Sequence, residues 1–458
     1  MVRRGYRQRS VFEVLLPDGG KLWELELTGI DEVLCDEGLI DLVQEALSRR
    51  SKRSRVAGRP GTPAEVVLRM LVLKHLYDWS FEECERQVRA NLVYRQFCRV
   101  GCERVADSKT LIRLARVLGP EVLKAIVERL VTIARQRKVV RGHRMRVDTT
   151  VVETNIHYPT DSRLLADGVR VITRTAKRIV EKLGEKGLAI RDRTRAVGRR
   201  VFALALASRQ ATQEKAKAQM KKLYGELMGQ TRAVLRQAER VAKRARRLKA
   251  AELAEQLEET VGVVGRVLAQ TKARVFKGDT HYPDKVLSIF EPHTEAIRRG
   301  KAAKPTEFGK MVKIQEAEAQ LITDYEVLPI RVPDMELWVG SLEHHQKLFA
   351  RPPRLAVADA GFASDANEKK AQQMGVRRVA LPRRGRLSRQ RRTHQRERWF
   401  RRALRWRTGS EGRISSLKRR HGLARCRYRG QEGMQRWVGL GVIANNLLAI
   451  SRAQGAKT

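Results

Sequence analysis

The stretch Arg144-Met145-Arg146-Val147-Asp148-Thr149-Thr150 decides how this chain is interpreted. Polar and apolar residues alternate in it, which predicts a short strand with Val147 as its last inward-facing residue. Asp148 is then expected at the carboxyl end of the strand, where open mixed sheets place their ligands. An aspartate in such a place is more often a turn or cap residue, so a catalytic role depends on further carboxylates.

A second carboxylate in a well-defined context is Asp359. It ends the apolar run 355–358, which predicts another strand. Gly361, two residues later, lets the backbone turn tightly beside the acid. Asp359 is therefore expected at a strand end, as Asp148 is.

The third carboxylate is Glu411, which follows Arg407 by four residues and precedes Lys418 by seven. The three side chains share one face of a predicted helix. A carboxylate flanked by two cations suits a scissile phosphate. An ordinary salt-bridge ladder on an exposed helix is the alternative, and Gly409 and Gly412 weaken the helix locally.

Three acids of this kind suit two-metal chemistry. Cleavage of a phosphodiester by two divalent ions requires acidic oxygens that hold the ions about 3.5 to 4 Å apart. Mg²⁺ binds a few carboxylates together with water and substrate phosphate. Asp148, Asp359 and Glu411 meet this need if two strand ends and one helix meet at one edge of the sheet.

The charge of the chain points to a polyanionic partner. The 458 residues include 95 Lys+Arg and 51 Asp+Glu, for a net charge of +44 spread over the whole length. Such self-repulsion favours nucleic acid as the partner. No apolar run is long enough to span a bilayer, and none follows the basic N-terminus as in a signal peptide. We therefore expect no membrane partner and a cytoplasmic protein.

Two N-terminal regions differ in composition. Residues 1–59 are predicted to be a basic segment and linker. Residues 60–135 carry helix-start signals at Thr62, Ser80 and Asp107. Short helices with tight turns and basic faces predict a helix-turn-helix-like DNA-binding domain. A helical bundle that only supports the catalytic domain is an equally open alternative.

Residues 167–276 are rich in Ala, Lys, Arg and Glu and contain no proline. Apolar residues at helical spacing predict two or three long helices, broken near 184–187 and around Leu248. The longest is expected to extend on the order of 70 to 80 Å. This region is interpreted as an insertion that projects from a compact domain.

The strand pattern resumes after the insertion. Further strands are predicted at 286–290, 311–314, 321–328, 355–359 and 376–381. Together with the strand of Asp148 they predict a mixed sheet, so residues 136–166 and 277–455 are expected to form one catalytic domain.

At this point the chain resembles a family. Asp148-Thr149-Thr150-Val151-Val152-Glu153, Asp359-Ala360-Gly361-Phe362 and Arg407…Glu411…Lys418 are similar to the three acidic motifs of bacterial insertion-sequence DDE transposases. The last resembles the branch whose motif is Tyr-x2-Arg-x3-Glu-x6-Lys, and residues 62–118 resemble the N-terminal domain of those enzymes. Leu404 stands in the place of the tyrosine, and the long insertion lies between the first and second acids.

The resemblance implies an α/β fold with an RNase H-like mixed sheet, a long helical insertion and an N-terminal helical DNA-binding domain. It implies that Asp148, Asp359 and Glu411 bind two Mg²⁺ or Mn²⁺ ions, while Arg407 and Lys418 hold the phosphate. Activated water would cut at the transposon ends, and the freed 3′-hydroxyl would attack target DNA. The implied partner is double-stranded DNA, with the terminal inverted repeats and the target site bound by a homodimer.

Aromatic and basic residues precede the third acid. An indole can receive a base pulled from the stack, and Trp399 is the better candidate because Trp406 is turned about 100° from Arg407 on a helix. Arg401 and Arg402 are candidate DNA ligands in the same segment. The alternative is that both tryptophans pack beneath the helix.

Two other functions remain open from the sequence. A basic DNA-binding, architectural or repressor protein would carry the acids for structural reasons and would show no metal-dependent cutting. An RNase H-like nuclease would cut DNA without strand transfer.

Overall fold

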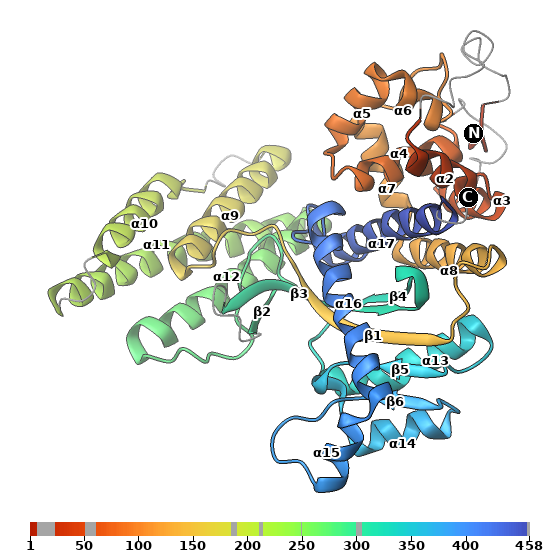
Figure 1. Cartoon of the computed structure of the whole chain (residues 1–458). Helices are drawn as coiled ribbons and strands as arrows, with labels where there is room; N and C mark the ends of the chain where they lie inside the picture. Colours follow the sequence, from red (N-terminus) through yellow and green to blue (C-terminus); the bar gives the residue numbers. More distant parts are fainter. Residues whose placement is uncertain are drawn as a thin grey trace. The chain divides into compact units, whose positions relative to one another are not determined.

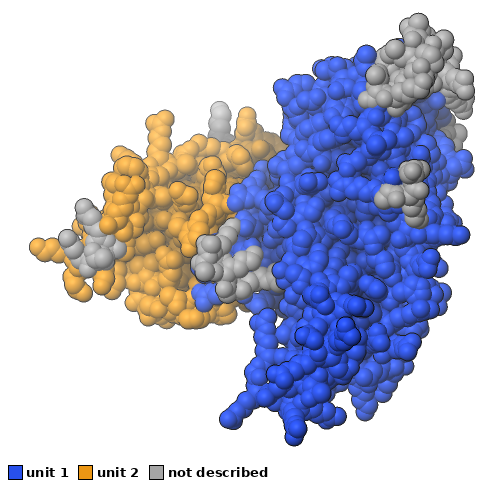
Figure 2. All heavy atoms as spheres, viewed as in Figure 1, with its two compact units in different colours: residues 1–155, 297–458 blue, residues 156–296 orange. Residues whose placement is uncertain are grey.

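The computed structural model describes residues 1–6, 23–50, 61–184, 190–209, 214–248, 250–298 and 305–455. Residues 7–22 and 51–59 of the predicted N-terminal segment and linker lie outside these ranges. The chain divides into two compact units, Met1–Asn155 with Ile297–Thr458, and Ile156–Ala296 (Figure 2). Each unit has a hydrophobic core of its own.

The first unit contains a mixed sheet in the order β2-β3-β1-β5-β6, with β4 also paired to β3 (Figure 1). Its strands are β1 Arg144–Glu153, β2 Glu295–Arg298, β3 Thr306–Glu316, β4 Ile322–Val327, β5 Leu355–Val357 and β6 Arg378–Ala380. The β1–β3 and β3–β4 pairs are antiparallel, whereas β5 runs parallel to both β1 and β6. The strands predicted around 311–314, 321–328, 355–359 and 376–381 are confirmed.

Strand β1 is the buried centre of this sheet. Eight of its ten residues, Met145 to Val152, are buried, because helices cover both faces of the strand. Asp148 is the fifth residue of β1, so its predicted place at the strand end is wrong. The alternating pattern could not show that the strand continues, because Thr149, Thr150, Val151 and Val152 are buried alike.

Among the described residues, the helices before β1 are α2 Leu25–Leu34, α3 Glu37–Ser48, α4 Ala64–Leu76, α5 Phe81–Ala90, α6 Leu92–Phe97, α7 Ser108–Val117 and α8 Pro120–Gln136. The predicted starts at Ser80 and Asp107 are confirmed, since each side chain accepts a backbone N–H three residues on. Helix α4 is buried almost throughout. These helices share one continuous core with α17 and with β3 and β4, as a supporting bundle would.

Five helices follow or flank the parallel strands: α13 Leu337–Phe349, α14 Asp365–Gln373, α15 Arg389–Arg396, α16 Arg398–Arg420 and α17 Gly430–Gly455. Short 3₁₀ turns lie at Glu318–Gln320, Asp334–Glu336 and Ala360–Phe362. Helix α16 crosses the sheet and contacts β1, β5 and β6 (Figure 1). It continues without a break through Gly409 and Gly412.

The second unit, residues 156–296, is a helical bundle of α9 Asp161–Leu183, α10 Thr194–Ser208, α11 Glu214–Arg247 and α12 Ala251–Lys277. The predicted breaks after 184 and near Leu248 are confirmed. The longest helix described, α11, has 34 residues and spans about 51 Å, shorter than the predicted 70 to 80 Å because a further break follows Ser208.

The strand predicted at 286–290 is wrong. The side-chain amide of Gln270 on α12 takes both backbone groups of Val286, accepting its N–H at 2.9 Å and donating to its carbonyl at 3.1 Å. The apolar residues Val286 and Ile289 pack on the helical core instead of on a sheet. No helix among the described residues is long and apolar enough to cross a membrane.

Candidate active site

The strand register brings Asp148 and Asp359 to the same level of the sheet. Arg146 of β1 is the parallel partner of Val357 of β5. Asp148 follows Arg146 by two residues, and Asp359 follows Val357 by two residues. Strand β5 ends at Val357, so the two acids meet where β1 loses its parallel neighbour. Asp148 therefore lies at the end of this strand pairing, although it lies within its own strand.

The surroundings of Asp148 disfavour its negative charge. The residue is only 7% exposed. Burial raises the pKa of Asp148 above its ordinary value, and the nearby charge of Asp359 raises it further. Opposing hydrogen bonds come from the Thr149 N–H at 2.8 Å and the Ser410 hydroxyl at 3.1 Å. Two neighbouring carboxylates, one of them buried, favour a bound cation.

Asp359 caps the 3₁₀ turn Ala360–Phe362, and its Oδ1 accepts the Gly361 N–H at 2.9 Å. Gly361 has no positive φ. The space beside Gly361 is tight, because a Cβ would lie 3.0 Å from Asp334 Oδ2 and 3.1 Å from Asp359 Oδ1. The turn thus holds the Asp359 carboxylate in one orientation.

Helix α16 brings Arg407 and Glu411 to Asp148. Arg407 Nη1 lies 3.8 Å from Asp148 Oδ2, and Arg407 Nη2 lies 3.0 Å from Glu411 Oε1. The Glu411 side chain is 61% exposed. The predicted shared face of Arg407 and Glu411 is therefore present. Glu411 is connected to Asp148 through the Arg407 guanidinium and makes no direct hydrogen bond to it.

A buried arginine fixes α16 on the sheet. Arg146 faces the same side of β1 as Asp148, because side chains alternate along a strand. It donates to the Trp406 carbonyl of α16 and to Glu316 of β3, the latter at 2.6 Å. Gly409 makes this approach possible, since a Cβ would lie 2.5 Å from Arg146 Nη1.

Sequence reasoning did not find Ser410 or Arg146. The signal for Arg146 was its position two residues before Asp148, which puts the two side chains on one face. The signal for Ser410 was its position directly before Glu411. Neither contact could be assigned without knowing where α16 crosses β1.

The remaining candidate residues occupy different parts of α16. Lys418 Nζ lies 4.0 Å from Glu307 Oε1 on β3. Arg401 is exposed. Arg402 and Trp399 line a cavity at the other end of the helix. Trp399 precedes Glu411 by twelve residues, which is about 18 Å along the helix axis, so it lies far from the third acid.

The apolar residues of this segment pack beneath the helix. Leu404, in the place of the motif tyrosine, packs with Trp399 and Trp406 against Phe400 and Ala403 of the same helix and against β5 and β6. Both tryptophans are partly buried in this cluster, and the prediction that Trp399 receives a base stays a prediction.

The donor set fits a divalent cation only in part. Asp148 and Asp359 offer adjacent carboxylates, one of them buried, and Mg²⁺ and Mn²⁺ prefer such oxygens. Within the described ranges, no three His, Cys, Asp or Glu side chains are grouped as ligands of one metal ion. Glu411 is the candidate third ligand, and its carboxylate is paired with Arg407.

Two family models match this chain. Residues 27–116 match a transposase domain (DUF772), and residues 366–450 match a transposase DDE domain. The chain therefore carries two regions similar to transposase domains. The first match runs from α2 to α7, and the second includes Arg407, Glu411 and Lys418. Asp148 and Asp359 lie outside both matched ranges.

One curated relative has no assigned activity. The "Uncharacterized protein ORF8 in nfe locus" of Rhizobium meliloti is 31% identical to this chain over 130 residues. The match covers 27% of this chain and 63% of that protein. No solved structure matches the chain.

Proposed function

We propose that this chain is a DNA transposase that cuts phosphodiester bonds at the ends of its element and joins the freed 3′-hydroxyl to target DNA. The observation that carries the proposal is the meeting of Asp148 and Asp359 at one level of the sheet, next to the Arg407–Glu411 pair. The matches to transposase domains support the class of activity. The strand order β4-β3-β1-β5-β6, with an antiparallel meander followed by two parallel strands, supports an RNase H-like core.

Asp148 and Asp359 would hold the metal ions, with Glu411 as the further ligand. Two bound Mg²⁺ or Mn²⁺ ions supply an activated nucleophile and stabilise the leaving oxygen of the phosphodiester. The chain contributes placement. Ser410 and the Thr149 N–H orient the Asp148 carboxylate, and burial keeps water from it.

Arg407 and Lys418 would bind the phosphate. Arg407 contacts Asp148 and Glu411, and phosphate oxygens compete with carboxylates for the same guanidinium. We expect Arg407 to pair with the scissile phosphate when DNA binds, which leaves Glu411 available as a ligand. Lys418 lies on the same helix face and would extend this contact.

A cleavage assay on DNA that carries the element's own end sequences tests the proposal. Asp148→Asn, Asp359→Asn and Glu411→Gln are each expected to reduce Mg²⁺-dependent cleavage by at least about 100-fold, with little change in DNA binding. Asp365→Asn is the matched control, because Asp365 is exposed and lies six residues after Asp359. Normal cleavage by Asp148→Asn would contradict the assignment, and binding without any cleavage by the wild type would favour the non-catalytic DNA-binding alternative.

A further inference from the structure

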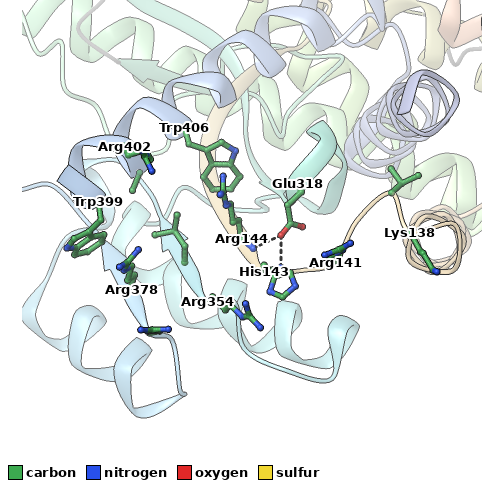
Figure 3. Close-up of a pocket in the computed structure, with 14 residues that line it drawn as sticks. Lys138, Arg141, His143, Arg144, Glu318, Arg354, Arg378, Trp399, Arg402 and Trp406 are labelled. Atoms are coloured by element: carbon green, nitrogen blue, oxygen red, sulfur yellow. Dashed lines mark hydrogen bonds between the residues drawn. The ribbon is translucent and has the colours of Figure 1, made fainter. Parts of the chain in front are cut away.

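A second site lies at the opposite end of the parallel strands. A cavity of about 660 Å³ opens in the first unit where β1, β5 and β6 begin (Figure 3). Arg144 is the first residue of β1, Arg354 precedes β5, and Arg378 is the first residue of β6. We call this cavity the arginine cleft. The acids Asp148 and Asp359 lie toward the other end of β5.

The arginine cleft is strongly cationic. Besides Lys138, it is lined by Arg141, Arg144, Arg354, Arg377, Arg378 and Arg402. Its lining acid is Glu318, whose carboxylate accepts the backbone N–H groups of residues 142, 143 and 144 at 2.6 to 3.0 Å (Figure 3). Glu318 therefore shapes the cleft wall.

The arginines of the cleft remain available to a ligand. Among the residues that the structure describes, no carboxylate pairs with Arg144, Arg354 or Arg402. All three are exposed. The pKa of His143 in the cleft wall is lowered by desolvation and then by the charge of Arg354. Such a surface favours phosphate groups.

Two indoles stand among these cations. Trp399 and Trp406 line the cleft from α16 (Figure 3). The Arg378 guanidinium lies 5.4 Å from the Trp399 ring centroid, and Arg146 lies 4.9 Å from that of Trp406. Both rings are half-buried on the apolar cluster beneath α16, so they are held rigidly. Aromatic surfaces beside arginines accept unstacked bases.

The size of the cleft favours single-stranded over double-stranded DNA. About 660 Å³ is the volume of a small-ligand pocket. It admits one or two nucleotides, whereas the paired bases of a duplex do not expose a face to an indole. Along α16, Trp399 lies about 18 Å from Glu411. This corresponds to about five steps of a stacked strand at 3.4 Å each.

We propose that the arginine cleft binds single-stranded DNA, with phosphates on the arginines and a base on Trp399 or Trp406. The ligand chemistry is that of a nucleoside phosphate. The strand would be one that leads to or from the acids along α16. The path of this strand along α16 rests on the proposed function, whereas binding of a single strand in the cleft does not.

Binding of a fluorescently labelled twelve-nucleotide oligo-dT by the full chain in EDTA tests the proposal. The double variant Arg144→Gln/Arg354→Gln is expected to bind at least about tenfold more weakly. Its plot of log K against log salt should be shallower by about 1.4, because two phosphate contacts are lost. The charge-matched control is Arg236→Gln/Arg240→Gln on α11, where both arginines are exposed and the expected change is less than about twofold. Equal losses in both double variants would overturn the cleft as the site.

Further arms distinguish the ligand. Trp399→Leu is expected to weaken oligo-dT binding by about 5- to 100-fold while duplex binding changes little, and Arg402→Gln provides a single exposed change if the double variant does not fold. Displacement of the oligonucleotide by dTMP at equal nucleotide concentration would overturn the single strand in favour of a free-nucleotide site. Equal losses of duplex and oligo-dT binding would also contradict it. Asp148→Asn should bind oligo-dT normally even though it does not cleave, so failure of the proposed catalysis leaves this test intact.

Discussion

The two ends of the short parallel strands differ in how their charged side chains are paired and exposed. At the acid end, Arg146 and Glu316 are buried and paired, and Asp148 is hydrogen-bonded and contacted by Arg407. At the arginine cleft, the Arg144 side chain is exposed and forms no ion pair with a carboxylate among the described residues. Arg144 and Arg146 differ by two positions on one strand. Paired charges fix geometry, and unpaired charges are available to a ligand.

The largest expected effect breaks the pairing at the acid end. Arg146→Ala leaves Glu316 buried without its main partner, and burial already raises the pKa of Glu316. We expect a loss of about 3 to 5 kcal/mol in the free energy of unfolding. Arg144→Ala, the matched control, should change it by less than about 0.5 kcal/mol. Urea unfolding measures both. Equal effects would remove the difference between the two ends.

The double variant Arg146→Met/Glu316→Leu separates charge from packing. It removes both buried charges and retains most of the volume, so most of the stability should return. A loss as large as that of Arg146→Ala would show that the specific contact with the Trp406 carbonyl matters more than charge.

A smaller effect is expected from the two glycines of α16. Gly409→Ala places a Cβ against Arg146 Nη1 and should cost about 1 to 3 kcal/mol. No atom lies within 4 Å of a Cβ built on Gly412, so Gly412→Ala should stabilise the helix by about 0.5 to 1 kcal/mol. Thermal unfolding compares the pair. Stabilisation by both changes would contradict the close packing of α16 on β1.

A similarly small effect is expected from Asp148 itself. Because its pKa is raised in the folded protein, the folded state holds the proton more tightly than the unfolded state, and stability falls as pH rises through this pKa. Asp148→Asn removes the charge and should stabilise the protein by about 1 kcal/mol at about pH 7. The gain should shrink toward acidic pH, as Asp148 takes up its proton. If Asp148→Asn were less stable than the wild type at about pH 7, the prediction that the charge of Asp148 destabilises the folded state would be contradicted.

The sequence predicted much of the sheet and of the helix pattern. Strand alternation, helix starts at Ser80 and Asp107, and the shared face of Arg407 and Glu411 are local properties, and each is present. The strand at 286–290 failed because a helix side chain, Gln270, took the role of a neighbouring strand. This hydrogen bonding by Gln270 depends on tertiary packing.

The assembly of the two ends could not be predicted. Asp148 and Asp359 meet only through the register of β1 with β5, and the sequence between them does not encode that register locally. The arginine cleft collects strand starts that are more than 200 residues apart, such as Arg144 and Arg354. Their composition signalled a nucleic-acid partner without showing where the cations gather.

Binding of Mn²⁺, followed by its electron paramagnetic resonance signal, tests the central claim most directly. If Asp148 and Asp359 form the metal pair, Asp148→Asn and Asp359→Asn should each lower the affinity at least about tenfold. Asp365→Asn should bind as the wild type does. The wild-type affinity should also fall toward acidic pH, because protons compete for Asp148, whose pKa is raised. Unchanged affinity in either of the first two variants would contradict the assignment of these carboxylates as the metal site.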